Sequence, residues 1–108
     1  MTVKELSELT ELNVLSLPCP ERKIDGVYIG DLLSWVMGRA TADNAWITIM
    51  SNLNVIAVAS LSDVSCVILA EDVRLEDEVL TLAKDKEINV FSTALSAYEL
   101  AVKLNGIL

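Results

Sequence analysis

The strongest constraint on the fold is a regular alternation of strand-like and helix-like segments in the second half of the chain. Short apolar runs rich in β-branched residues lie at 45–50 (AWITIM), 65–70 (SCVILA) and 88–93 (INVFST). Segment 75–87 has acids in its first turn, lysines in its last turn and an apolar stripe, which is typical of a helix. Ser96 and Glu99 match a capping box that opens another helix, which we expect to end at Asn105-Gly106.

Segment 52–61 (NLNVIAVASL) decides the fold, because its apolar run suits a buried strand or a buried helix. Propensity alone favours the strand, which would make this region a hairpin. Ser51, Asn52 and Asn54 are helix-start signals, so we predict a helix from Asn52 to Leu61. Strands that alternate with helices pair in parallel through right-handed crossovers. The sequence thus predicts an α/β fold: one compact domain over residues 1–108, with a mostly parallel sheet covered by helices.

The first half of the chain has shorter elements. A capping box at Thr2 predicts a short helix at its start. We expect a helix within 31–40, with Asp31 as its N-cap and Gly38 as its stop. Strands are expected at 13–17 and 26–29, on either side of a loop that contains both prolines.

Charge and composition exclude several functions. The formal net charge is −8 with no basic patch, which argues against nucleic acid and anionic membrane as partners. No apolar run reaches the roughly 20 residues of a membrane span, and the charged start does not resemble a signal peptide, so we expect a cytoplasmic protein. The chain has two cysteines and no histidine, so we expect no metal site, no cofactor and no catalytic residue.

Three stretches of the chain carry a resemblance to a known family, namely DGVYIGDLLSWVMGRA, WITIMSNLNVIAVASLSDVSCVIL and INVFSTALSAYELAVKL. Together they resemble the DRTGG domain family over residues 24–104. The family is similar to the N-terminal domain of HPr kinase/phosphorylase, and members accompany phosphotransacetylase catalytic domains or paired CBS domains. The resemblance implies an α/β regulatory or ligand-sensing module. It also favours the helix for segment 52–61.

One departure from the family bears on phosphate binding. Where the glycine motif of the family would follow a strand, this chain has Ala70-Glu71-Asp72. A glycine pair permits positive φ and a close approach of the backbone to a ligand, whereas two acids repel a phosphate. Paired carboxylates could also serve acid–base chemistry or hold a divalent cation, but adjacent acids before a helix are ordinary, and we favour a solvated turn.

Candidate ligand-binding residues follow from the topology, because open parallel sheets bind ligands beyond the carboxyl ends of their strands. Helix capping and turn formation explain the same residues, and we favour that explanation because neither lysine nor arginine is expected beside these turns. Trp35 and Trp46 are expected in the core or an interface. The candidates at the strand ends are Ser51, Asn52, Asn54, Glu71, Asp72, Ser92 and Thr93.

The functional hypothesis is a non-catalytic module that acts through a partner protein or a small effector. The alternative is a small hydrolase or transferase that uses Ser51, Cys19 or Thr93. We also expect a homodimer, because helix 52–61 would be apolar nearly all round and one sheet covers only one side of it. The residues expected at this interface are Val55, Val58 and Ala59.

Overall fold

A five-stranded sheet organises the computed structural model, which describes residues 1–108. The strand order is β1-β5-β4-β3-β2; β2 to β5 run parallel, and β1 pairs antiparallel with β5 at one edge. The mostly parallel α/β fold is therefore confirmed. In chain order the elements are α1 (Val3–Ser7), β1 (Leu12–Ser16), β2 (Val27–Ile29), α2 (Leu33–Arg39), β3 (Ala45–Thr48), α3 (Leu53–Ser62), β4 (Cys66–Leu69), α4 (Asp77–Asp85), β5 (Val90–Thr93) and α5 (Ala97–Asn105).

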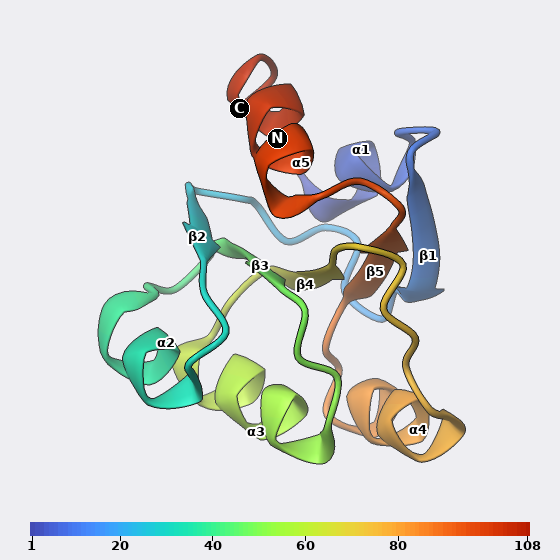
Figure 1. Cartoon of the computed structure of the whole chain (residues 1–108). Coiled ribbons are helices and arrows are strands. Elements are labelled where there is room, and N and C mark those ends of the chain that lie inside the picture. Colours follow the sequence, from blue (N-terminus) through green and yellow to red (C-terminus); the bar gives the residue numbers. More distant parts are fainter.

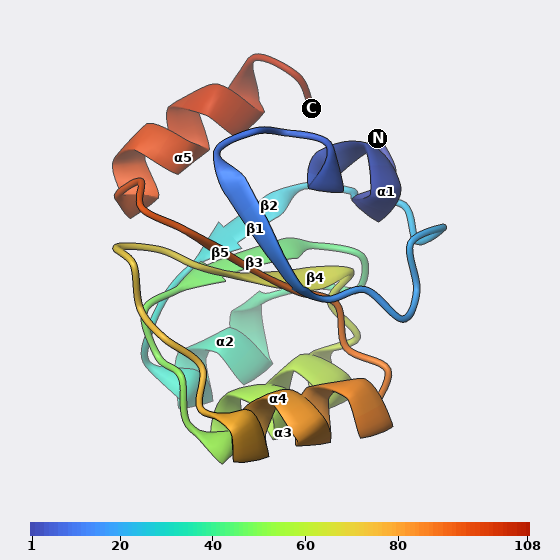
Figure 2. The same ribbon diagram turned by 90° about the vertical axis from the view of Figure 1, so that its right-hand side faces the viewer.

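Helices cover both faces of the sheet, so the molecule has three layers (Figure 1). α2, α3 and α4 lie side by side on one face, and α1 and α5 lie on the other (Figure 2). Each face has its own apolar core, one centred on Trp46 and the other on Phe91, and both aromatic rings are fully buried. No helix is both long enough and apolar enough to cross a membrane.

Segment 52–61 is a helix, as predicted. Asn52 is the N-cap of α3, and its Oδ1 accepts a hydrogen bond of 2.9 Å from the backbone N–H of Asn54. α3 packs between α2 and α4 as well as against the sheet, so three elements cover it. This arrangement explains why the segment lacks a polar face on most of its circumference.

The cover over α3 corrects the predicted dimer interface. Val55, Val58 and Ala59 are buried within the core of the single chain, at 0%, 6% and 0% exposed. The expectation that one sheet would leave them uncovered overlooked the flanking helices α2 and α4. These three side chains therefore offer no surface to a second copy of the folded chain.

Two details of α2 also differ from the prediction. α2 begins at Leu33 with Leu32 as its N-cap, and no side chain caps it. Asp31 instead binds across the sheet, where its Oδ1 accepts from Thr48 Oγ1 at 2.8 Å and from the N–H of Ile49 at 3.0 Å. Gly38 does not stop the helix, which continues through Arg39. The two predicted capping boxes, by contrast, are confirmed at Thr2–Glu5 and Ser96–Glu99.

Candidate functional site

The predicted candidate residues all lie at the edge of the sheet where the parallel strands end. Ser51, Asn52 and Asn54 follow β3, Glu71 and Asp72 follow β4, and Ser92 and Thr93 end β5. The loops after these three strands lie beside one another in both views of the ribbon (Figures 1 and 2). Five of the seven residues line one of two cavities, Thr93 is buried, and Glu71 is exposed and lines neither cavity.

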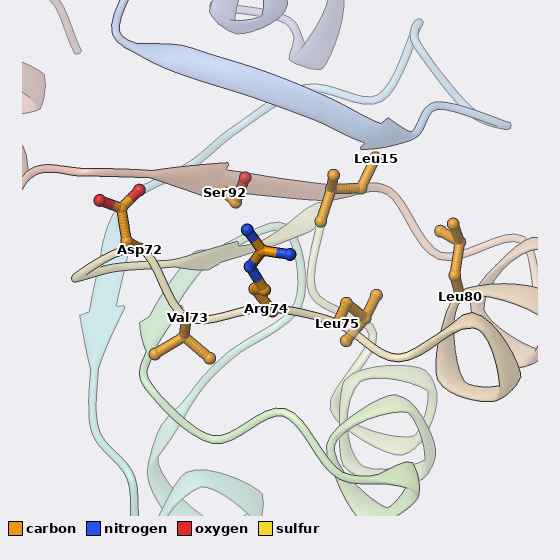
Figure 3. A pocket seen from close by; sticks show the side chains of 7 residues that line it. All are labelled: Leu15, Asp72, Val73, Arg74, Leu75, Leu80 and Ser92. Carbon is orange, nitrogen blue, oxygen red and sulfur yellow. The ribbon is translucent and has the colours of Figure 1, made fainter.

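The first of these, which we call the β5 cavity, opens between the end of β5 and the start of α4. It has a volume of about 520 Å³, within the range of roughly 300–1,000 Å³ that small-molecule sites occupy. Asp72 and Ser92 are the predicted residues that reach it. Its lining includes Leu15, Asp72, Arg74, Leu75, Leu80 and Ser92 (Figure 3).

The second, the α3 cavity, lies where the N-termini of α3 and α4 approach each other. It also has a volume of about 520 Å³, and it is the more polar of the two. All three predicted residues after β3 line it, together with Glu76, the N-cap of α4, and Glu78 in the first turn of α4. Its lining includes Ser51, Asn52, Asn54, Arg74, Glu76 and Glu78.

Arg74 lines both cavities and is the residue that the sequence analysis missed. It lies in the loop between β4 and α4, two residues beyond Asp72, so the inference that no cation flanks these turns was wrong. The three ion pairs of the chain join other residues, namely Arg22–Asp43, Arg22–Asp63 and Lys103–Glu11. Arg74 is exposed, and its guanidinium forms no ion pair within the chain. A cation two residues after the acids was the available sequence signal.

Glu71 and Asp72 form a tight turn with left-handed backbone angles, φ 62° and 59°. The N–H of Val73 donates to the carbonyl of Ala70 at 3.2 Å and closes the turn. The N–H groups of Glu71 and Asp72 donate to the carbonyls of Leu95 and Thr93, both at 2.9 Å. The turn thus has the backbone conformation that glycine favours, but its amides are used within the chain and its side chains are acidic.

Thr93 supports the edge from within the protein. Its side chain is buried, its Oγ1 donates to the carbonyl of Glu11 at 2.8 Å, and it accepts from the N–H of Leu95 at 3.2 Å. These bonds join the end of β5 to the start of β1 and shape the loop into α5. Thr93 therefore has no access to a ligand, whereas its neighbour Ser92 borders the β5 cavity.

The three nucleophiles of the alternative hypothesis lie in different surroundings. Ser51 borders the α3 cavity, Thr93 is buried, and Cys19 lies near the amino end of β5, where its N–H donates to Asn89 Oδ1 at 2.9 Å. Burial raises the pKa of the other thiol, Cys66, to about 12, so it stays protonated in the core. No group of three or more acidic or cysteine side chains is arranged to hold a metal ion.

The tryptophans differ from each other in their surroundings. Trp46 is a core residue, as expected, and its Nε1–H donates to the carbonyl of Gly30 at 2.9 Å. Trp35 is 52% exposed on α2, where the guanidinium of Arg39 lies 3.8 Å from the centre of its ring. Neither tryptophan is among the residues that line the β5 or the α3 cavity.

Comparison with solved structures supports the same fold. The regulatory region of a Clostridium perfringens pyrophosphatase, solved as its CBS and DRTGG domains with the activator diadenosine tetraphosphate, superposes with a TM-score of 0.73 at 13% sequence identity. The match covers 94% of this chain and 44% of the pyrophosphatase chain, so this chain corresponds to less than half of that structure. No protein of curated function matches the sequence. The DRTGG domain pattern matches residues 21–107, most of the chain. The chain therefore belongs to the DRTGG domain family.

Proposed function

We propose that this chain is a non-catalytic regulatory module that binds a small effector at the carboxyl edge of its sheet. The observation that carries the proposal is Arg74, an exposed guanidinium without an ion-pair partner that borders two cavities at once. A free guanidinium beside a cavity is a strong recognition group for carboxylates and other planar anions. None of the three candidate nucleophiles, Ser51, Cys19 and Thr93, donates a hydrogen bond to a carboxylate that could act as its general base, which favours binding over turnover.

The fold comparison supports a regulatory role. The similar structure is described as a regulatory region that binds an activator. The carboxyl edge of the present sheet is where open α/β sheets hold ligands, and its residues come from three different loops. We extend regulation by a small effector to this chain on these two grounds.

The signal would pass through the loop that connects β4 to α4. Arg74 lies in this loop, and α4 begins at Asp77. An effector that holds the guanidinium draws the loop against the end of β5 and fixes the start of α4. The exposed face of α4 then changes its mobility, which a partner protein or a second copy of the chain can sense.

The test is a thermal-shift screen of nucleotides, amino acids and organic acids against the purified full chain. A ligand at a hundredfold excess over its Kd stabilises the fold by about 2.7 kcal/mol, which is easily measured. Arg74→Gln should abolish the shift, and Arg39→Gln, which removes an exposed guanidinium from α2, should leave it unchanged. If no compound raises the melting temperature, the effector proposal is wrong. Turnover of an ester substrate that Ser51→Ala or Cys19→Ala abolishes would favour the enzyme alternative instead.

A further inference from the structure

The β5 cavity is lined by two charged side chains, one hydroxyl and four apolar side chains. Leu15 of β1, Leu75 of the β4–α4 loop and Leu80 of α4 gather on one side (Figure 3). Asp72 lies on the other side with Val73 near it, and Arg74 lies between the two groups. Ser92 of β5 lines the same cavity as Arg74, and its Oγ accepts from Asn13 Nδ2 at 3.4 Å. A ligand in this cavity meets a polar end and an aliphatic end.

The polar end carries two charges of opposite sign that do not neutralise each other in an ion pair. The carboxylate of Asp72 and the guanidinium of Arg74 form no ion pair with each other or with any other side chain. The side chain of Asp72 is exposed at the rim, and its backbone N–H is held by the carbonyl of Thr93. The cavity thus offers one site for an anionic group and one for a cationic group.

We propose that the β5 cavity binds a free α-amino acid with an aliphatic side chain, an inference that rests on the proposed effector-binding function. The carboxylate of the amino acid is held by Arg74 and the hydroxyl of Ser92, and its ammonium group is held by Asp72. Its side chain packs against Leu15, Leu75 and Leu80, which removes apolar surface of both partners from water. Each charged or apolar part of such a ligand then has a counterpart in the cavity.

The charge of the protein argues for this zwitterion over a phosphate-rich ligand. The chain has a formal net charge of −8, and Arg74 is the only cation among the residues that line the cavity. A nucleotide would bring several negative charges beside Asp72, and the amides of the turn are already bonded within the chain. An amino acid has no net charge and avoids this repulsion.

Calorimetric titration of the full chain with L-leucine and three analogues tests the assignment. The analogue 4-methylpentanoate lacks the ammonium group, 3-methylbutylamine lacks the carboxylate, and glycine lacks the side chain. We expect L-leucine to bind at least about tenfold more tightly than each analogue, because each lacks one partner of the cavity.

Two variants should erase this discrimination selectively. Asp72→Asn keeps a residue that tolerates positive φ and should equalise the affinities for L-leucine and 4-methylpentanoate. Arg74→Gln should equalise those for L-leucine and 3-methylbutylamine. Asp85→Asn and Arg39→Gln make the same changes at exposed sites on α4 and α2 and should leave all affinities unchanged, and circular dichroism checks that every variant folds.

The outcomes separate this inference from the broader proposal. Binding of ATP or inorganic phosphate that depends on Arg74, without binding of L-leucine, overturns the amino-acid assignment and leaves effector binding standing. L-Leucine binding that neither Asp72→Asn nor Arg74→Gln weakens overturns the site. The absence of binding by every compound in the wider screen overturns both.

Discussion

Asn89 pairs with the backbone of Cys19 in both directions, as two strands would. Its Nδ2 donates to the carbonyl of Cys19, and its Oδ1 accepts from the N–H of Cys19, both at 2.9 Å. The same Nδ2 donates to the carbonyl of Ser65 at 2.9 Å, and the side chain is 1% exposed. One amide therefore fastens the loop after β1 to the amino ends of β4 and β5.

Asn89→Ala should lower the free energy of unfolding by about 3 kcal/mol, because it leaves buried backbone groups without partners. Urea denaturation followed by circular dichroism measures the change. Asn105→Ala, at an exposed residue at the end of α5, is the control and should cost less than about 1 kcal/mol. Equal effects of the two substitutions would contradict the bridging role of Asn89.

A charged residue on the buried side of α3 should unfold the chain, and not merely convert a dimer into folded monomers. Val58 is 6% exposed, so Val58→Lys places an ammonium group among the side chains of the core. The substitution should lower the free energy of unfolding by about 3 kcal/mol or more. Leu61→Lys, on the same helix but 71% exposed, should be tolerated. Circular dichroism measures whether each variant folds, and light scattering measures its oligomeric state. If the wild type is a dimer and Val58→Lys is a folded monomer, α3 is the interface after all.

The left-handed turn at Asp72 predicts an unusual order of substitution effects. Asp72→Val should destabilise by about 1–2 kcal/mol, because a β-branched residue is strained at positive φ. Asp72→Gly should change stability by less than about 1 kcal/mol, because relief of strain offsets the greater freedom of the unfolded chain. At Glu76, where φ is −68°, the order should reverse and glycine should be the more costly residue. Thermal melts of the four variants test this pattern.

Acid should weaken the helix caps. Backbone hydrogen bonding to Thr2 and to Ser96 holds the pKa of Glu5 and of Glu99 below the usual 4.5, and the side chain of Lys103 does the same for Glu11. Because the folded-state pKa is lowered, the stability that these groups contribute is present above pH 4.5 and is lost as the pH falls through the folded-state value. We therefore expect the urea midpoint to fall as the pH is lowered below about 5.

Glu99→Gln tests this pH dependence, because glutamine can still accept the capping hydrogen bond but does not titrate. The variant should lose less stability in acid than the wild type. Glu21→Gln, at an exposed acid without a side-chain hydrogen bond, is the control. A wild-type acid profile that Glu99→Gln leaves unaltered would show that the cap does not contribute.

Local patterns in the sequence predicted the elements well because the interactions behind them span three or four residues. Ser96 and Glu99 cap α5 as their spacing indicated, and Asn52 starts α3. Asp31 has the residue type of an N-cap but bonds to Thr48 on the neighbouring strand, a partner that local sequence does not reveal. The cover of α3 by α2 and α4 likewise depends on how the crossovers arrange helices on one face.

The candidate site was predicted in its location but not in its central residue. The rule that ligands bind at strand carboxyl ends found the loops after β3, β4 and β5, which the structure brings together. The rule did not identify Arg74 as a candidate, because it points only to residues directly at the strand ends. Thr93 was chosen for a hydroxyl that the structure uses internally. Its burial could not be predicted, because both faces of β5 are covered and its buried and exposed positions do not alternate.

The antiparallel pairing of β1 with β5 limits how early the sheet can be completed during synthesis of the chain. Leu12 faces Thr93 across the ladder, so β1 leaves the ribosome long before its partner exists. At about 5–20 residues per second, the roughly 80 residues between them take about 4–16 s to make. β1 remains unpaired for that interval. The parallel strands can assemble in chain order, and the sheet is complete only when β5 takes its place between β4 and β1.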